Sequence, residues 1–177
     1  RGSVRVIALI ETAMAVDAIS EIVQSRTDPH RLHTIAFGAA DYSADIGIKM
    51  TMDGTELIYP RSKLVVACRA AGIAPPLDTP FMIDLKDIEA LKDDAARAKQ
   101  LGFQGKLCIH PNQIEPVHLI FTPSTEEISF ARRVVEAFEA EEAGGSAAIQ
   151  VDGKFVDYPV VERSRRILQL ASMISGR

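Results

Sequence analysis

Short apolar runs of strand length alternate with stretches of helical periodicity over the first two thirds of the chain. The strand-like runs are residues 4–10, 33–37, 77–83 and 106–109. Between them, apolar residues recur on one helical face at residues 13–24, 62–71 and 86–101. The second and third of these stretches are each followed by a glycine, Gly72 and Gly102, which is typical of a helix end. Strands separated by helices pair in parallel, so this part is predicted to be α/β with a parallel sheet.

The pattern changes after residue 110, where helices dominate. A short helix is predicted at 112–118, a long one at 124–143 and an amphipathic one at 159–172. Ser124 and Glu127 have the spacing of a capping box, which places the start of the long helix. The sequence Gly144-Gly145-Ser146 predicts a break, and residues 149–152 are a candidate strand.

Two acidic residues follow apolar strands. Glu11 ends the run 4–10, and Asp41 comes four residues after the run 34–37, behind Gly38-Ala39-Ala40. In a parallel sheet both would lie at the carboxyl edge of the strands, where α/β folds place their chemistry. Carboxylates with room for water and substrate suit Mg²⁺. The alternative is a pair of strand-end acids satisfied by helix caps or basic partners.

Composition narrows the class of protein. The chain has 177 residues, enough for one domain with a core, and a net charge of −4 with scattered lysines and arginines, which argues against nucleic acid. Cys68 and Cys108 form neither a disulfide framework nor a zinc spacing, which indicates a reduced, intracellular protein. No apolar stretch approaches the roughly 18 residues of a membrane span.

The number of β/α units leaves two architectures open. Four units make half of a (β/α)₈ barrel, which needs roughly 250 residues. The chain is therefore either a small open sheet or the C-terminal half of a barrel.

Seven segments in order resemble the citrate lyase beta-subunit-like and malyl-CoA or citramalyl-CoA lyases of the HpcH/HpaI aldolase superfamily. They are LIETA (9–13), AFGAADYSADIG (36–47), PRSKLVVACRAAGI (60–73), LDTPF (77–81), LGFQGKLCIHPNQI (101–114), FTPSTEEISFARRVVEAFEAEE (121–142) and DGKFVDYPVVERSRRIL (152–168). The resemblance begins at what would be the fifth barrel strand. It implies the C-terminal half of a TIM barrel over residues 1–120 and a helical extension or lid over 121–177.

The resemblance also implies an activity. Such enzymes cleave carbon–carbon bonds of acyl-CoA thioesters by retro-Claisen chemistry, with Mg²⁺ as cofactor. We therefore expect a lyase that converts a citramalyl-, malyl- or citryl-CoA type substrate into a keto acid and an acyl-CoA. A homotrimer is the family expectation, in the cytoplasm or, in a eukaryote, the mitochondrial matrix. The first half-barrel, where such enzymes keep an arginine, another acid and much of their CoA contact, is not matched.

Two other functions stay open. One is a class II aldolase of the same wider group, acting on hydroxy keto acids without CoA. The other is a catalytically silent fragment or paralogue that binds partner subunits.

The same resemblance suggests roles for individual residues. Glu11 and Asp41 match the metal ligands. Backbone amides of Gly38, Ala39 and Ala40, at the start of a helix, are expected to bind the keto-acid carboxylate, although small residues also suit a tight strand-to-helix turn.

Other candidates lie further along the chain. Asp157 matches an acid/base that reaches a neighbouring subunit's site, the alternative being an acid at a helix N-terminus. His110 and Pro111 are expected to shape the CoA channel, and a neutral His110 could instead be a general base. Asp45 is expected on the helix surface or behind the metal ligands, outside the metal site itself. Arg61 is expected to be solvated or to meet CoA phosphates.

Overall fold

The computed structural model describes residues 4–25, 31–142 and 148–176. The predicted break at Gly144-Gly145-Ser146 lies outside these residues. The chain divides into two compact units, Arg1–Phe121 and Thr122–Arg177, which are described separately.

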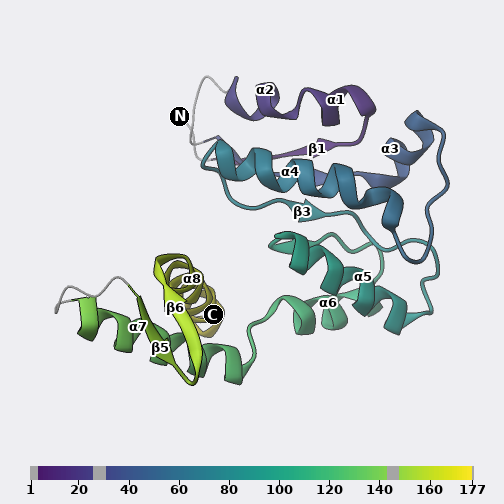
Figure 1. The fold of residues 1–177 in the computed structure, drawn as a ribbon. Helices are drawn as coiled ribbons and strands as arrows, with labels where there is room; N and C mark the ends of the chain where they lie inside the picture. Colours follow the sequence, from purple (N-terminus) through teal and green to yellow (C-terminus); the bar gives the residue numbers. More distant parts are fainter. Residues whose placement is uncertain (1–3, 26–30, 143–147, 177) are drawn as a thin grey trace. The chain divides into compact units, whose positions relative to one another are not determined.

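The first unit is built on a parallel sheet with strand order β1-β2-β3-β4 (Figure 1). The strands are β1 Val6–Ile10, β2 Leu32–Phe37, β3 Leu77–Asp78 and β4 Gly105–Lys106. The predicted parallel α/β pattern is therefore confirmed. β3 is shorter than predicted, and two residues after it Pro80 has no N–H to donate to a strand ladder.

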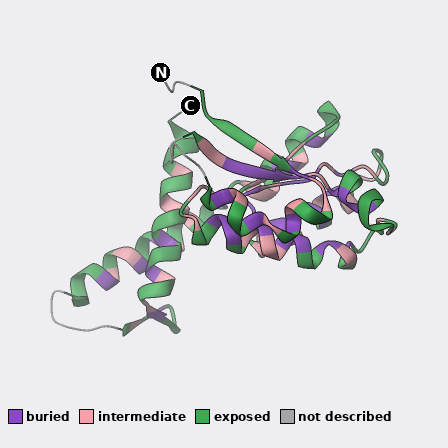
Figure 2. Cartoon of the chain, turned by 90° about the horizontal axis from the view of Figure 1, so that it is seen from above, coloured by how far each residue is buried: buried purple, intermediate pink, exposed green. Residues whose placement is uncertain are grey.

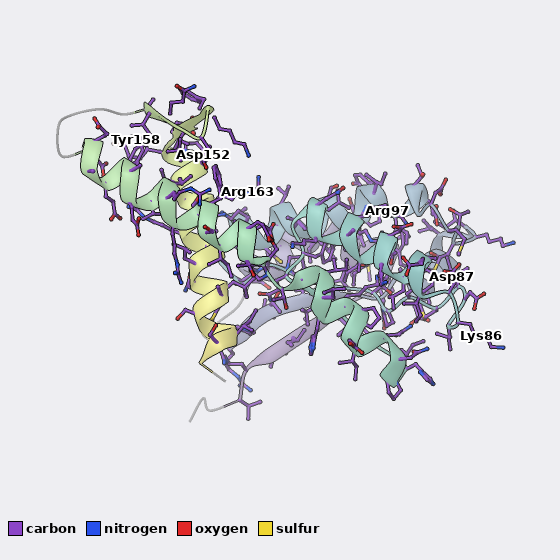
Figure 3. The ribbon with its side chains drawn as sticks, turned by 90° about the horizontal axis from the view of Figure 1, so that it is seen from below. Lys86, Asp87, Arg97, Asp152, Tyr158 and Arg163 are labelled. Carbon is purple, nitrogen blue, oxygen red and sulfur yellow. The ribbon has the colours of Figure 1, made fainter. Side chains whose placement is uncertain are left out.

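Helices connect the strands in alternation. They are α1 Ala13–Asp17, α2 Ile19–Gln24, α3 Ala39–Ile46, α4 Ile58–Ala70, α5 Ile88–Leu101 and α6 Ile114–Phe121, with 3₁₀ turns at Thr55–Leu57 and Pro111–Gln113. The single helix expected at 13–24 is thus two helices that meet at Ala18. At the start of α5, Asp87 (labelled in Figure 3) accepts the N–H of Ala90 at 2.9 Å as the N-cap.

One face of the sheet packs against helices. Ile35 and Phe37 of β2 are fully buried in a core that also contains Ile19 of α2 and Leu64 of α4. The side chains of β1 alternate: Ile10 belongs to this core, whereas its neighbour Leu9 is 51 % exposed. Figure 2 shows much of this strand in the colour of exposed residues.

Four buried charges join α4, β3, α5 and β4. Arg61 donates from Nε to Asp78 Oδ1 at 3.0 Å and from Nη2 to Asp94 Oδ1 at 2.9 Å, and Lys106 Nζ donates to Asp78 Oδ2 at 2.7 Å and also contacts Asp94. Two cations and two anions balance, which is the condition for burying them. Burial alone would raise the pKa of Asp94, but Lys106 and Arg61 hold it below its ordinary value. The expectation of a solvated or phosphate-binding Arg61 is wrong, because its side chain is 1 % exposed.

The second unit consists of α7 Thr125–Glu142, an antiparallel hairpin of β5 Ala148–Val151 and β6 Lys154–Asp157, and α8 Tyr158–Ser175. Its core holds Val134, Phe138, Val151, Val156 and Val161. Asp152 and Gly153 form the hairpin turn with φ of 50° and 75°, the backbone that two-residue hairpins require. Figure 3 labels Asp152 at this turn and Tyr158 at the start of α8.

The predicted capping box is confirmed. Ser124 Oγ accepts the N–H of Glu127 at 3.1 Å, and the Glu127 carboxylate accepts the N–H of Ser124 at 2.8 Å. No helix in the described part of the chain is both long and apolar enough to cross a membrane.

Candidate metal and carboxylate site

Glu11 lies directly after β1, against the backbone of Gly38. The ladder between β1 and β2 is extended by a bond from Gly38 N–H to the carbonyl of Ile10 at 2.9 Å. A Cβ added to Gly38 would lie 2.6 Å from Glu11 Cβ and 2.9 Å from its Oε2. With φ of −104°, Gly38 is not needed for its backbone freedom, so what it provides is space for the Glu11 side chain.

Asp41 lies in the first turn of α3, the helix that follows β2 (Figure 1). Because β1 and β2 are parallel, the start of α3 and Glu11, which follows β1, lie at the same end of the strand pair. Asp41 is exposed, and Glu11 is partly buried. Among the described residues, neither carboxylate has a hydrogen bond or ion pair, so the caps or basic partners of the alternative interpretation are not found there. No third His, Cys, Asp or Glu joins them in a metal cluster within the described ranges. Two carboxylates suit Mg²⁺, which keeps several water or substrate ligands.

The start of α3 offers backbone N–H groups, but fewer than the sequence suggested. Gly38 N–H is used by Ile10, and Ala39 N–H donates to the Thr79 hydroxyl at 3.1 Å. The first turn of a helix has no internal partner for its N–H groups. Those of Ala40 and Asp41 are thus the donors left for an anion at this helix N-terminus.

Two residues outside the predicted site hold α3 in place. Thr79, after β3, accepts the N–H of Ala39, and its buried side chain ties α3 to the sheet. Asp45 accepts the N–H of Ala13, the first residue of α1, at 2.7 Å. The spacing of Asp41 and Asp45 places both on one face of α3, but no sequence signal points to Thr79 or to Ala13 as a partner.

His110 and Pro111 lie in the turn after β4. The ring Nδ1 of His110 accepts the N–H of Asn112 at 3.2 Å, which caps the 3₁₀ turn that begins at Pro111. The side chain of Asn112 donates to the carbonyl of Leu85 at 3.0 Å. Buried Gln113 also donates to the loop after β3, so the two loops are fixed to each other. A CoA contact by His110 and Pro111 stays a prediction.

Asp157 lies in the second unit, at the end of β6. It is the N-cap of α8 and accepts the N–H of Val160 at 3.4 Å. Asp157 therefore has the helix N-terminal position that the sequence offers as the alternative to an acid/base role. The cap leaves the carboxylate partly exposed, so a second role toward a neighbouring subunit stays a prediction.

Comparisons with known proteins place the chain among relatives of about twice its length. The model of the HpcH/HpaI aldolase/citrate lyase family matches residues 1–111. The citrate lyase subunit beta of Escherichia coli (strain K12) is 37% identical over 172 residues, which are 97% of this chain and 55% of that protein. The mitochondrial citramalyl-CoA lyase of Mus musculus is 32% identical over 176 residues, 97% of this chain and 52% of that protein.

A solved structure agrees with the sequence relatives. CitE from Mycobacterium tuberculosis, in complex with magnesium, acetoacetate and coenzyme A, matches with a TM-score of 0.77 and 32% identity, over 95% of this chain and 61% of that one. The chain therefore spans about half the length of the curated relatives it matches. The structural match confirms the predicted fold class, in which the chain corresponds to part of a TIM-barrel protein with a helical C-terminus.

Proposed function

The chain belongs to the HpcH/HpaI aldolase/citrate lyase family. We propose that the protein is a Mg²⁺-dependent lyase of β-hydroxyacyl-CoA thioesters. The substrate would be of the citramalyl-, malyl- or citryl-CoA type, and the products a keto acid and an acyl-CoA. The observation that carries the proposal is the pair Glu11 and Asp41, both without a protein partner among the described residues at one end of adjacent strands.

Glu11 and Asp41 would hold the Mg²⁺. When bound there, the ion would supply Lewis-acid stabilisation of the alkoxide oxygen that the substrate hydroxyl becomes when it loses its proton, before the carbon–carbon bond breaks, an effect of several kcal/mol. Gly38 supports this arrangement by leaving room for the Glu11 side chain.

The substrate carboxylate would lie at the start of α3. The N–H groups of Ala40 and Asp41 would donate to it, within the anion-favouring field of the helix N-terminus. The N–H groups of Gly38 and Ala39 already donate to Ile10 and Thr79. These two residues would therefore contribute to carboxylate binding through their small size and by fixing the turn into α3.

Asp157 would act as the acid/base from a neighbouring subunit of a homotrimer, taking the proton of the substrate hydroxyl and returning it to the thioester enolate. Its partly exposed carboxylate at the start of α8 supports this role. His110 and Pro111 would contact CoA at the carboxyl end of β4.

The test is an assay of citramalyl-CoA and malyl-CoA cleavage by the intact protein, after its mass has been measured. We expect keto-acid release that requires Mg²⁺ and falls by at least about 100-fold in Glu11→Gln and in Asp41→Asn, the size expected for losing several kcal/mol. Asp93→Asn, an exposed acid on α5, is the matched control and should retain activity. An intact protein that binds neither Mg²⁺ nor an acyl-CoA would contradict the proposal. Turnover of a hydroxy keto acid without CoA would favour the aldolase instead.

A further inference from the structure

Two hydrogen bonds bracket the segments that carry Glu11 and Asp41. On one side, Gly38 N–H donates to the carbonyl of Ile10, the residue before Glu11. On the other side, Ala13 N–H donates to the Asp45 carboxylate at 2.7 Å, across 32 positions of sequence. Beyond Gly38 the two segments leave the sheet for different helices. Within the described ranges, the Asp45 bond is the only hydrogen bond that joins α1 to α3.

The Ala13 N–H is a helix-terminal donor, and the Asp45 carboxylate is an anionic acceptor. Ala13 is the first residue of α1, so its N–H has no partner within the helix. Thr12 caps the same helix through the N–H of Ala15, at 3.1 Å, and leaves the N–H of Ala13 to Asp45. An anionic acceptor at a helix N-terminus makes a stronger hydrogen bond than a neutral one.

Asp45 also has a fixed relation to Asp41. The two lie one turn apart on α3 and therefore on the same face of it. A movement of α1 away from α3 would separate Glu11 from Asp41, and the Asp45 bond opposes that movement. One carboxylate oxygen of Asp45 is already committed to Ala13, which favours a supporting role over direct coordination.

We propose that Asp45 is a positioning residue that holds Glu11 and Asp41 at the separation required to share one divalent cation. The inference rests on the proposed function, because it assumes that these two carboxylates bind the ion. Partners behind metal ligands typically contribute 10- to 100-fold to metal affinity.

The first measurement is Mn²⁺ binding to the intact protein, followed by electron paramagnetic resonance of the free ion. We expect Asp45→Ala to weaken binding by about 10- to 100-fold. Asp45→Asn keeps an oxygen that accepts from Ala13, so its affinity should stay within roughly threefold of the wild type. Asp93→Ala, an exposed acid on α5, is the charge-matched control and should bind as the wild type does. Unchanged binding in Asp45→Ala overturns the proposal. Equal losses in the alanine and asparagine variants also overturn it, because the charge of Asp45 rather than its hydrogen bond would then matter.

The second measurement needs no metal. Hydrogen exchange of a peptide covering residues 11–17 should be faster in Asp45→Ala and close to wild type in Asp45→Asn, since α1 loses its tie only in the former. Unchanged exchange in Asp45→Ala overturns the positioning role even if the wild type binds Mn²⁺. A wild type that binds no Mn²⁺, but shows the expected exchange pattern, overturns the proposed metal site and leaves Asp45 as a link between two helices only.

Discussion

Gly38 is the residue whose side chain, or lack of one, most directly shapes the candidate site. Because its φ is an ordinary −104°, alanine is allowed by the backbone and excluded only by Glu11. A substitution at Gly38 would therefore cause a steric conflict without backbone strain, whereas at many glycines both occur together.

We predict that Gly38→Ala displaces the Glu11 carboxylate and weakens Mn²⁺ binding by at least about 10-fold. Overpacking of this kind costs about 1–3 kcal/mol of stability, so the protein should still fold. Metal titration and thermal unfolding on the same sample measure both effects. Gly176→Ala, where a Cβ would be 3.4 Å from the nearest described atom, is the matched control. Unaltered metal binding in Gly38→Ala would show that the position of Glu11 is not limited by this contact.

At the scale of elements, the short strands β3 and β4 are held by charge as well as by backbone pairing. Each has two residues, and Asp78 and Lys106 contribute one side chain from each strand to the buried network with Arg61 and Asp94. Removing one member leaves an unpaired buried charge, which is far more costly than losing an exposed pair.

Lys106→Met should lower the free energy of unfolding by about 3–5 kcal/mol. Urea denaturation followed by circular dichroism measures the change. Lys63→Met is the control, because Lys63 pairs with a largely exposed Asp17 at 3.2 Å and its loss should cost less than about 1 kcal/mol. Similar losses in the two variants would mean that the buried network does not stabilise the fold.

The network also predicts a dependence of stability on pH. In the folded state the pKa of Asp94 lies below its ordinary value of 3.8, because Lys106 and Arg61 outweigh the effect of burial. The unfolded chain therefore takes up a proton at Asp94 at higher pH than the folded one. The stabilisation is full well above pH 3.8 and is lost as the pH falls below that value toward the folded pKa. Urea midpoints measured between neutral pH and about pH 3 should fall less steeply in Asp94→Asn than in the wild type.

At the scale of the whole molecule, the proposed reaction needs residues from both units. Glu11 and Asp41 belong to the first unit and Asp157 to the second. The resemblance assigns Asp157 to a neighbouring subunit's site, so a complete site would exist only in an oligomer.

Mixed oligomers test this arrangement. Asp41→Asn and Asp157→Asn should each be nearly inactive alone. After the two are unfolded and refolded together in equal amounts, about a quarter of the sites should pair an intact Asp41 with an intact Asp157 from the next subunit, if assembly is random. Recovery of activity to about that fraction supports action between subunits. No recovery in oligomers shown to be mixed would place Asp157 in its own subunit's site, and an Asp157→Asn variant that is active alone would place it outside catalysis.

The sequence by itself was sufficient for features that depend on neighbours along the chain. Alternating apolar periods predicted the parallel α/β pattern, and the Ser124–Glu127 spacing predicted a helix start that the structure confirms. Glu11 and Asp41 were candidates because each follows an apolar run. The pattern along the chain does not indicate β6, because only the two turn residues Asp152 and Gly153 separate it from β5 and each strand is short.

Only the tertiary structure decided which groups meet across elements. It placed Arg61 in a buried network rather than in solvent, used the N–H of Ala39 for Thr79, and joined Asp45 to Ala13. These pairs lie between 17 and 40 positions apart in sequence. Local periodicity specifies which face of an element is apolar, but a polar partner depends on which elements pack together and in what register. That information exists only once the chain has folded.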